Sequence, residues 1–268
     1  MKNDTNLYLK IGAAIGYAAM VFVNYLANAL PIGGVTTGEA SDAYANLFTP
    51  AGLTFSIWGL IYLLLGAYVV YQFVYTKKKD DSKKDKLIAN VNKYFILSSL
   101  ANIAWIFAWH NGIIWLSVII MLVLLTCLIK LAEILKKETF ALTDYVFLKL
   151  PFSIYFGWIT VATIANITVF LVSLNWNGFG LSDVVWMILI VFVGAGIGIW
   201  RMLKDGNIAY GLVLVWAYSG ILYKHLSASG FAGEYPNVII SVIACIGLFV
   251  AGIVYLLLKK KTAKLNNK

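Results

Sequence analysis

Residues 48–72 read FTPAGLTFSIWGLIYLLLGAYVVYQ, a stretch of apolar and aromatic side chains without a single charged one. Phe55, Trp58 and Tyr62 follow one another within it at spacings of three and four residues. At 3.6 residues per turn, these spacings put all three rings on one face of a helix. The stretch therefore predicts one apolar helix whose aromatic stripe faces either neighbouring helices or a bound molecule.

The composition of the whole chain matches this stretch. Of its 268 residues 61% are hydrophobic and 12% are charged, and the mean hydropathy is +0.83. A soluble chain of this length covers its surface with polar groups, whereas apolar runs of about 20 residues match the hydrocarbon core of a bilayer. We therefore expect an all-α, polytopic helical membrane protein in a bacterial-type cell membrane, with the lipid bilayer as its partner. About eight transmembrane helices are predicted, at 11–30, 53–74, 92–109, 113–135, 145–174, 183–202, 208–224 and 238–258.

Basic residues predict how these helices are oriented. The formal net charge is +9, and Lys and Arg gather in the connections after the second, fourth and sixth helices and after the eighth. The connections after the first, third and fifth helices contain neither residue. Basic residues concentrate on the cytoplasmic side of membrane proteins, so both termini are predicted to be cytoplasmic. The charge is then a topology signal, and we expect no nucleic-acid partner. The most basic connection includes Lys77, Lys78 and Lys79.

Residues suited to catalysis or metal binding are scarce. Cys127 and Cys245 lie inside apolar runs, which predicts neither a disulfide framework nor a metal site. His110 and His225 lie close to predicted outer connections, where we expect surface imidazoles, with haem ligation as the alternative. Residues 194–198 read GAGIG inside an apolar run, which is typical of close helix packing rather than of a phosphate loop. We predict no catalytic residue and no metal ligand.

Two more stretches combine aromatic and amide side chains inside apolar runs. Residues 102–109 read NIAWIFAW, and residues 155–166 read YFGWITVATIAN. An unpaired carboxamide is costly in hydrocarbon, so Asn102 and Asn166 are expected to face a neighbouring helix or a ligand. The sequence leaves both interpretations open, just as Trp58 and Trp158 suit either plain packing or the wall of a binding site.

Together, the three stretches resemble the TspO/MBR family of tryptophan-rich sensory and translocator proteins. The family's second helix has an aromatic pattern behind a proline, its third has Asn-x-x-Trp, and its fifth has Tyr-x-x-Trp-x-x-x-Ala-x-x-x-Asn. The residues that match, and that the resemblance implies as ligand-binding residues, are Pro50, Phe55, Trp58, Tyr62, Asn102, Trp105, Trp109, Tyr155, Trp158, Ala162 and Asn166.

The resemblance implies a five-helix TspO-like bundle over residues 1–174, followed by a three-helix transmembrane segment over 175–268 with a basic cytoplasmic tail. It implies a pocket beneath the connection 31–49, which is expected either to cap that pocket or to be a solvated connector. The expected ligand is a hydrophobic, planar small molecule such as the tetrapyrroles protoporphyrin IX or haem, in a transport, sensory or receptor role. No cofactor is required, and a homodimer is left open.

Two alternatives remain at this stage. All eight helices could line the path of a secondary transporter or permease for another small molecule, although the centres of the predicted helices lack the carboxylates of ion-coupled pumps. A tetrapyrrole-degrading enzyme is the other alternative, and it rests on the family's proposed activities. We favour binding over catalysis, because the sequence offers no catalytic constellation.

Overall fold

The computed structural model describes residues 2–30, 32–75 and 82–266, so Lys77, Lys78 and Lys79 lie outside the described residues. Within these ranges the chain forms helices and contains no strand. The long helices are α1 (Lys2–Ala29), α3 (Ile57–Val74), α4 (Ser82–His110), α5 (Ile114–Lys136), α7 (Leu150–Ser173), α8 (Asp183–Asp205), α9 (Ile208–Leu226) and α10 (Pro236–Asn266). The short ones are η1 (Ile32–Gly34), α2 (Thr37–Asp42), η2 (Gly52–Ser56), α6 (Leu142–Asp144), the π-helical turn η3 (Tyr145–Lys149) and η4 (Gly178–Gly180).

Seven segments of the described chain are long and apolar enough to cross a membrane, which confirms the predicted all-α, polytopic helical class. The remaining long helix, α9, has 19 residues and coincides with the seventh predicted span, but it is not among these seven. It packs against both α8 and α10. A helix covered on two sides can carry polar groups such as Lys224 and His225, which lower its hydropathy. The seven segments are Asn6–Ala29, Gly52–Val74, Lys83–His110, Ile114–Lys136, Leu142–Ser173, Asp183–Asp205 and Pro236–Thr262.

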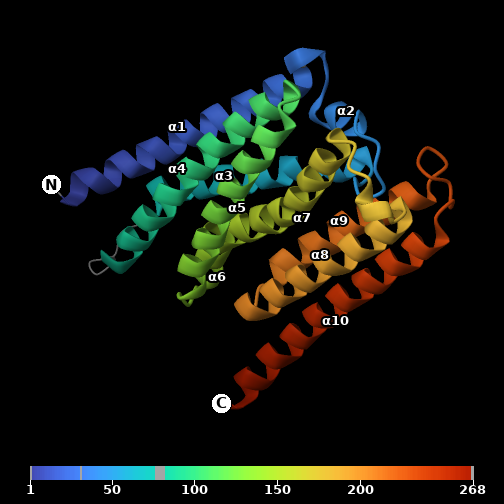
Figure 1. Cartoon of the computed structure of the whole chain (residues 1–268). Helices are drawn as coiled ribbons and strands as arrows, with labels where there is room; N and C mark the ends of the chain where they lie inside the picture. Colours follow the sequence, from blue (N-terminus) through green and yellow to red (C-terminus); the bar gives the residue numbers. More distant parts are fainter. Residues whose placement is uncertain (1, 31, 76–81, 267–268) are drawn as a thin grey trace. The chain divides into compact units, whose positions relative to one another are not determined.

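The chain divides into two compact units, and the division falls within α7. The first unit comprises Met1–Ala43 and Ile57–Ile159. In it α4 packs along α1 on one side and α5 on the other, and α3 packs on α1 (Figure 1). Buried polar side chains join these helices: the Tyr68 hydroxyl donates to Asn92 at 2.6 Å, and the Asn92 amide donates to Gln72 at 2.8 Å.

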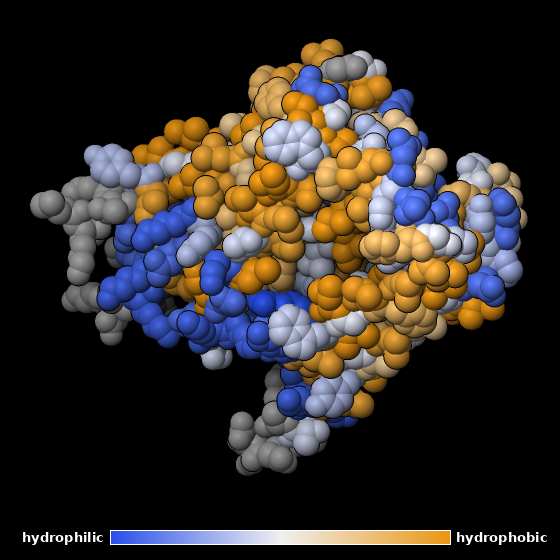
Figure 2. Space-filling view, viewed as in Figure 1, coloured by the Kyte–Doolittle hydropathy of each residue, from blue (hydrophilic) through white to orange (hydrophobic). Residues whose placement is uncertain are grey.

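The outward faces of the first unit are apolar. Phe22, Leu63 and Val70 are each at least 60% exposed. Figure 2 shows hydrophobic side chains over much of the visible face, with hydrophilic ones gathered where α4 begins and where α6 lies. There Lys84 pairs with Asp144 at 2.5 Å. Apolar side chains outside and polar ones inside or at the helix ends are the arrangement that a bilayer favours.

The second unit comprises Tyr44–Ser56 and Thr160–Lys268, and in it α8, α9 and α10 pack together (Figure 1). The GAGIG stretch lies on α8. A Cβ atom on Gly194 would lie 2.7 Å from the Tyr218 hydroxyl, and one on Gly198 would lie 2.6 Å from Leu214, whereas Gly196 has no such neighbour within 4 Å. The predicted role of these glycines in close helix packing is confirmed for Gly194 and Gly198.

The connection between α2 and α3 belongs to the second unit through hydrogen bonds to α9. The Ala51 backbone N–H donates to the Gly220 carbonyl at 3.2 Å, and the Trp216 indole N–H donates to the Thr54 carbonyl at 3.0 Å. These contacts hold residues Gly52–Ser56 as a separate 3₁₀ turn. The prediction of one continuous aromatic stripe is therefore wrong at Phe55, which lies in this turn, while α3 begins at Ile57.

The division into a five-helix bundle over residues 1–174 and a separate segment over residues 175–268 stays a prediction. A chain that ends at Ser173 tests whether the bundle folds alone. The truncation removes the α9 partners of Ala51 and Thr54, so we expect residues 44–56 to become accessible to chymotrypsin in detergent micelles. The full-length chain should resist cleavage there, and mass spectrometry of the fragments locates the cuts. Equal resistance of both chains would show that residues 175–268 are an appendage.

Alanine at Gly194 should destabilise the protein, because the added methyl group pushes the Tyr218 hydroxyl away from the Val191 carbonyl that it now binds at 2.9 Å. Overpacking of this kind costs about 1–3 kcal/mol. Gly196→Ala is the matched control, since its methyl group enters open space and improves helix propensity. Thermal unfolding in detergent should rank Gly194→Ala below both the wild type and Gly196→Ala. The opposite order would contradict the packing role.

Candidate functional site

Four of the predicted site residues form one cluster of rings in the first unit. Trp58 stacks on Tyr62 with ring centroids 5.4 Å apart and planes 19° apart. Trp58 also contacts Tyr155 and Trp158 edge-to-face, with ring centroids 5.8 Å and 6.3 Å away from its own. Stacked and edge-to-face pairs at such distances are the favourable aromatic geometries. The α7 rings are buried, whereas the two α3 rings are half-buried. We call these residues the four-ring cluster.

A chain of hydrogen bonds orients one ring of the cluster. The Asn24 amide N–H donates to the Asn102 carbonyl oxygen at 2.7 Å, and the Asn102 amide N–H donates to the Tyr155 hydroxyl at 3.2 Å. All three side chains are buried, and they lie on α1, α4 and α7. Asn102 therefore makes interhelical hydrogen bonds, one of the two interpretations open from sequence. Asn24 is not among the predicted site residues, because it lies nearer the end of its apolar run, where an amide is less informative.

The Tyr62 hydroxyl is an exception among these polar groups. It is buried and has no hydrogen-bond partner within the part of the chain that the structure describes. Tyr17 contacts the same residue, but its hydroxyl donates to the Tyr62 backbone carbonyl at 2.9 Å. A buried hydroxyl left unpaired costs about 1–3 kcal/mol. The four-ring cluster thus presents flat apolar surface beside one hydroxyl that is free to bind a further group.

Trp105 and Trp109 stack on each other near the end of α4, with ring centroids 5.3 Å apart, and Trp109 anchors α2. The Trp109 indole N–H donates to the Thr37 carbonyl at 3.3 Å. His110 Nδ1 lies 2.9 Å from the Ile32 carbonyl and therefore donates to it, and His110 Nε2 forms a hydrogen bond with the Thr37 hydroxyl at 3.0 Å. His110 is only 6% exposed, so the expectation of a surface imidazole is wrong, because its ring binds two residues of the connection between α1 and α3.

The first turn of α2 is fixed by a capping box. The Thr36 backbone N–H donates to the Glu39 carboxylate at 2.7 Å, and the Glu39 backbone N–H donates to the Thr36 hydroxyl at 3.3 Å. The bond from the Thr36 backbone lowers the pKa of Glu39. The connection 31–49 is thus an anchored segment where it forms α2, not only a solvated connector.

The other four predicted site residues belong to the second unit and are described with it. Pro50 is buried in the connection before α3, and Asn166 is 2% exposed on α7. Phe55 and Ala162 are half-buried. Their grouping with the four-ring cluster as one binding site stays a prediction.

His225 also departs from the expected surface imidazole. Its side chain has no exposed surface, and its Nε2 donates to the Leu47 carbonyl at 2.9 Å. Its ring packs against Phe231 with centroids 4.7 Å apart. This burial lowers the pKa of His225, so the ring is a neutral structural contact for the connection before α3.

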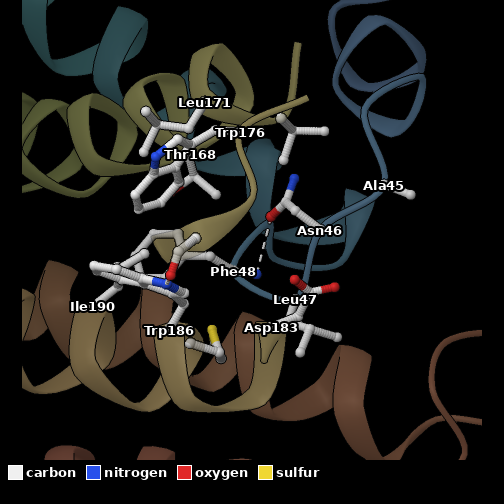
Figure 3. A pocket seen from close by; sticks show the side chains of 13 residues that line it. Ala45, Asn46, Leu47, Phe48, Thr168, Leu171, Trp176, Asp183, Trp186 and Ile190 are labelled. Carbon is white, nitrogen blue, oxygen red and sulfur yellow. Dashed lines mark hydrogen bonds between the residues drawn. The ribbon is translucent and has the colours of Figure 1, made fainter. Parts of the chain in front are cut away.

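A small cavity that the sequence reasoning missed lies in the second unit (Figure 3). Its volume is about 110 Å³, and its walls include Phe48, Leu171, Trp176, Asp183 and Trp186. Trp176 is the residue that could have indicated this cavity from the sequence, but an aromatic residue at the end of an apolar run also suits the membrane interface. Elsewhere in the described chain, no group of three or more His, Cys, Asp or Glu residues could hold a metal ion.

Comparison with known proteins places the chain in a family. The family model described as TSPO-like protein matches residues 10–255. The chain therefore belongs to the TSPO-like protein family and is an integral membrane protein of the TspO type. The match continues past residue 174 through α8 and α9 and into α10. No curated protein and no solved structure matches the chain.

The hydroxyl groups of Tyr155 and Tyr62 should differ in their effect on stability. Tyr155→Phe leaves the Asn102 amide N–H without its acceptor, which should lower the free energy of unfolding by about 1–3 kcal/mol. Tyr62→Phe removes a hydroxyl that has no partner in the described chain and should be neutral or stabilising. Thermal unfolding of both variants in detergent measures the difference. Equal losses would mean that the Tyr62 hydroxyl has a structural partner.

Proposed function

We propose that this TSPO-like protein binds a hydrophobic, planar small molecule at the four-ring cluster, and that its ligand is a tetrapyrrole such as protoporphyrin IX or haem. The observation that carries the proposal is the buried Tyr62 hydroxyl, which lacks a hydrogen-bond partner in the described chain beside stacked aromatic rings. A ligand with a carboxylate or ring nitrogen pairs with this hydroxyl, and its flat apolar body stacks on the adjacent ring.

The surroundings of the cluster support binding rather than chemistry. Asn102 and Tyr155 satisfy each other, which fixes the position of one ring without supplying a general acid or base. Trp158 is 2% exposed and closes the side of the cluster that lies on α7. A preorganised wall of this kind holds a rigid ligand at little entropic cost. In this proposal both termini are cytoplasmic, and the bound molecule is carried or sensed.

Titration of the purified full-length protein with protoporphyrin IX in dim light tests the proposal. Binding is read from the absorbance of the porphyrin, so that removing a tryptophan does not remove the reporter. We expect saturable binding by the wild type. Loss of one hydrogen bond worth about 0.5–1.5 kcal/mol should make Tyr62→Phe bind about 2- to 12-fold more weakly. Trp58→Phe, Trp158→Phe and Asn102→Ala should also weaken binding.

Trp115→Phe is the matched control, because Trp115 lies at the start of α5, is 56% exposed and is outside the cluster. Its affinity for the porphyrin should equal that of the wild type. An equal loss in Trp115→Phe would indicate nonspecific partitioning, and the absence of saturable binding by the wild type would remove the proposed function. Loss of porphyrin absorbance under light would point to degradation instead of binding.

A further inference from the structure

The cavity of the second unit is lined mainly by aromatic and aliphatic side chains from three separate segments (Figure 3). They come from the connection before α3, from the last turns of α7 and from the chain that leads into α8. Its volume of about 110 Å³ equals roughly four water molecules at about 30 Å³ each. Binding sites for drug-sized molecules measure about 300–1,000 Å³, so this cavity excludes a tetrapyrrole.

Two tryptophans in its wall are held in place by an unusual connection. The ring centroids of Trp176 and Trp186 lie 4.8 Å apart, and the two ring planes form an angle of 57°. The Trp186 indole N–H donates to the Gly178 carbonyl at 2.6 Å. Gly178 has φ +61°, and a Cβ there would lie 2.6 Å from the same indole nitrogen, so only glycine fits. Phe179, which follows, also has a positive φ of 54°. The connection thus fixes both rings against each other.

The side-chain donors of Asn46 and Thr168 in the wall are already paired. The Asn46 amide N–H donates to the Tyr44 carbonyl and to Thr49, and its oxygen accepts from two backbone N–H groups. The Thr168 hydroxyl donates to the Ile164 carbonyl at 3.0 Å. Asp183 is exposed to solvent and has neither a hydrogen-bond nor an ion-pair partner among the described residues, and it is the one charged residue among those that line the cavity.

We propose that this cavity binds a small organic cation with an apolar body, of the alkylammonium class. The faces of tryptophan rings attract cations through their quadrupole, and tryptophan is the strongest of the aromatic side chains in this respect. The Asp183 carboxylate supplies the opposite charge, whereas it repels an anion. A neutral polar molecule finds no free donor on Asn46 or Thr168 and no free acceptor on Asn46. The volume suits a trimethylammonium group with a short tail.

Calorimetric titration of the full-length protein with choline chloride tests this proposal, with 3,3-dimethyl-1-butanol as the neutral probe of the same shape. We expect saturable choline binding and at least tenfold weaker binding of the neutral alcohol. Asp183→Asn removes the charge but keeps the shape, and it should weaken choline binding at least tenfold. Glu234→Gln removes an exposed carboxylate that does not line the cavity, and it should change the affinity less than twofold.

A second variant guards against a folding defect, since Asp183 lies in the first turn of α8. Ile190→Phe fills the cavity without changing its charge and should abolish choline binding, with thermal unfolding confirming that each variant is folded. Equal binding of choline and the neutral alcohol would overturn the proposal. So would unchanged affinity in Asp183→Asn, or no binding of choline and tetramethylammonium by the wild type. Protoporphyrin binding should be unaffected in Asp183→Asn and Ile190→Phe, because neither residue belongs to the four-ring cluster.

Discussion

The chain of amides and a hydroxyl from Asn24 through Asn102 to Tyr155 is the interaction on which the first unit depends. Hydrocarbon offers no water to a polar group, so each such group inside a membrane helix must find its partner on another helix. This requirement ties α1, α4 and α7 together at one level of the unit. It also sets which face of α7 turns inward, and Trp158 lies one turn further along that face. The position of the aromatic rings follows from the pairing of the amides.

Because most buried polar groups are paired, the few that are not become informative. Tyr68, Asn92 and Gln72 form a second set of hydrogen bonds between α3 and α4. The Tyr62 hydroxyl, on the same helix as Tyr68, has no partner within the described residues. The second unit differs, since the side-chain donors of Asn46 and Thr168 beside its cavity are paired, while Asp183 is exposed to solvent and has no hydrogen-bond or ion-pair partner among the described residues.

Helix α9 holds the connection that precedes α3 in place through side-chain hydrogen bonds. In this connection, the carbonyls of Leu47 and Thr54 accept hydrogen bonds from His225 and Trp216, both on α9. The family match covers this region together with the helices that bind it, from residue 10 to residue 255. The connection before α3 and the helix α9 therefore act as one packed part of the protein, although about 160 residues of sequence separate them.

The sequence by itself determined the class of protein, the places of most helices, and the four aromatic residues and Asn102 that meet in the first unit. Hydropathy and helical spacing are local properties, and the bilayer imposes them on any chain that spans it. Gly194 and Gly198 were predictable as packing positions for the same reason.

Only the tertiary structure decided the rest. Phe55 lies in a 3₁₀ turn rather than on α3, because hydrogen bonds to α9 hold that turn. His110 and His225 are buried because they bind carbonyls that lie 78 and 178 residues away in the chain. The cavity joins three segments, of which none shows the site alone. Contacts between distant segments decide which polar groups are satisfied, and a local pattern of residues cannot contain that information.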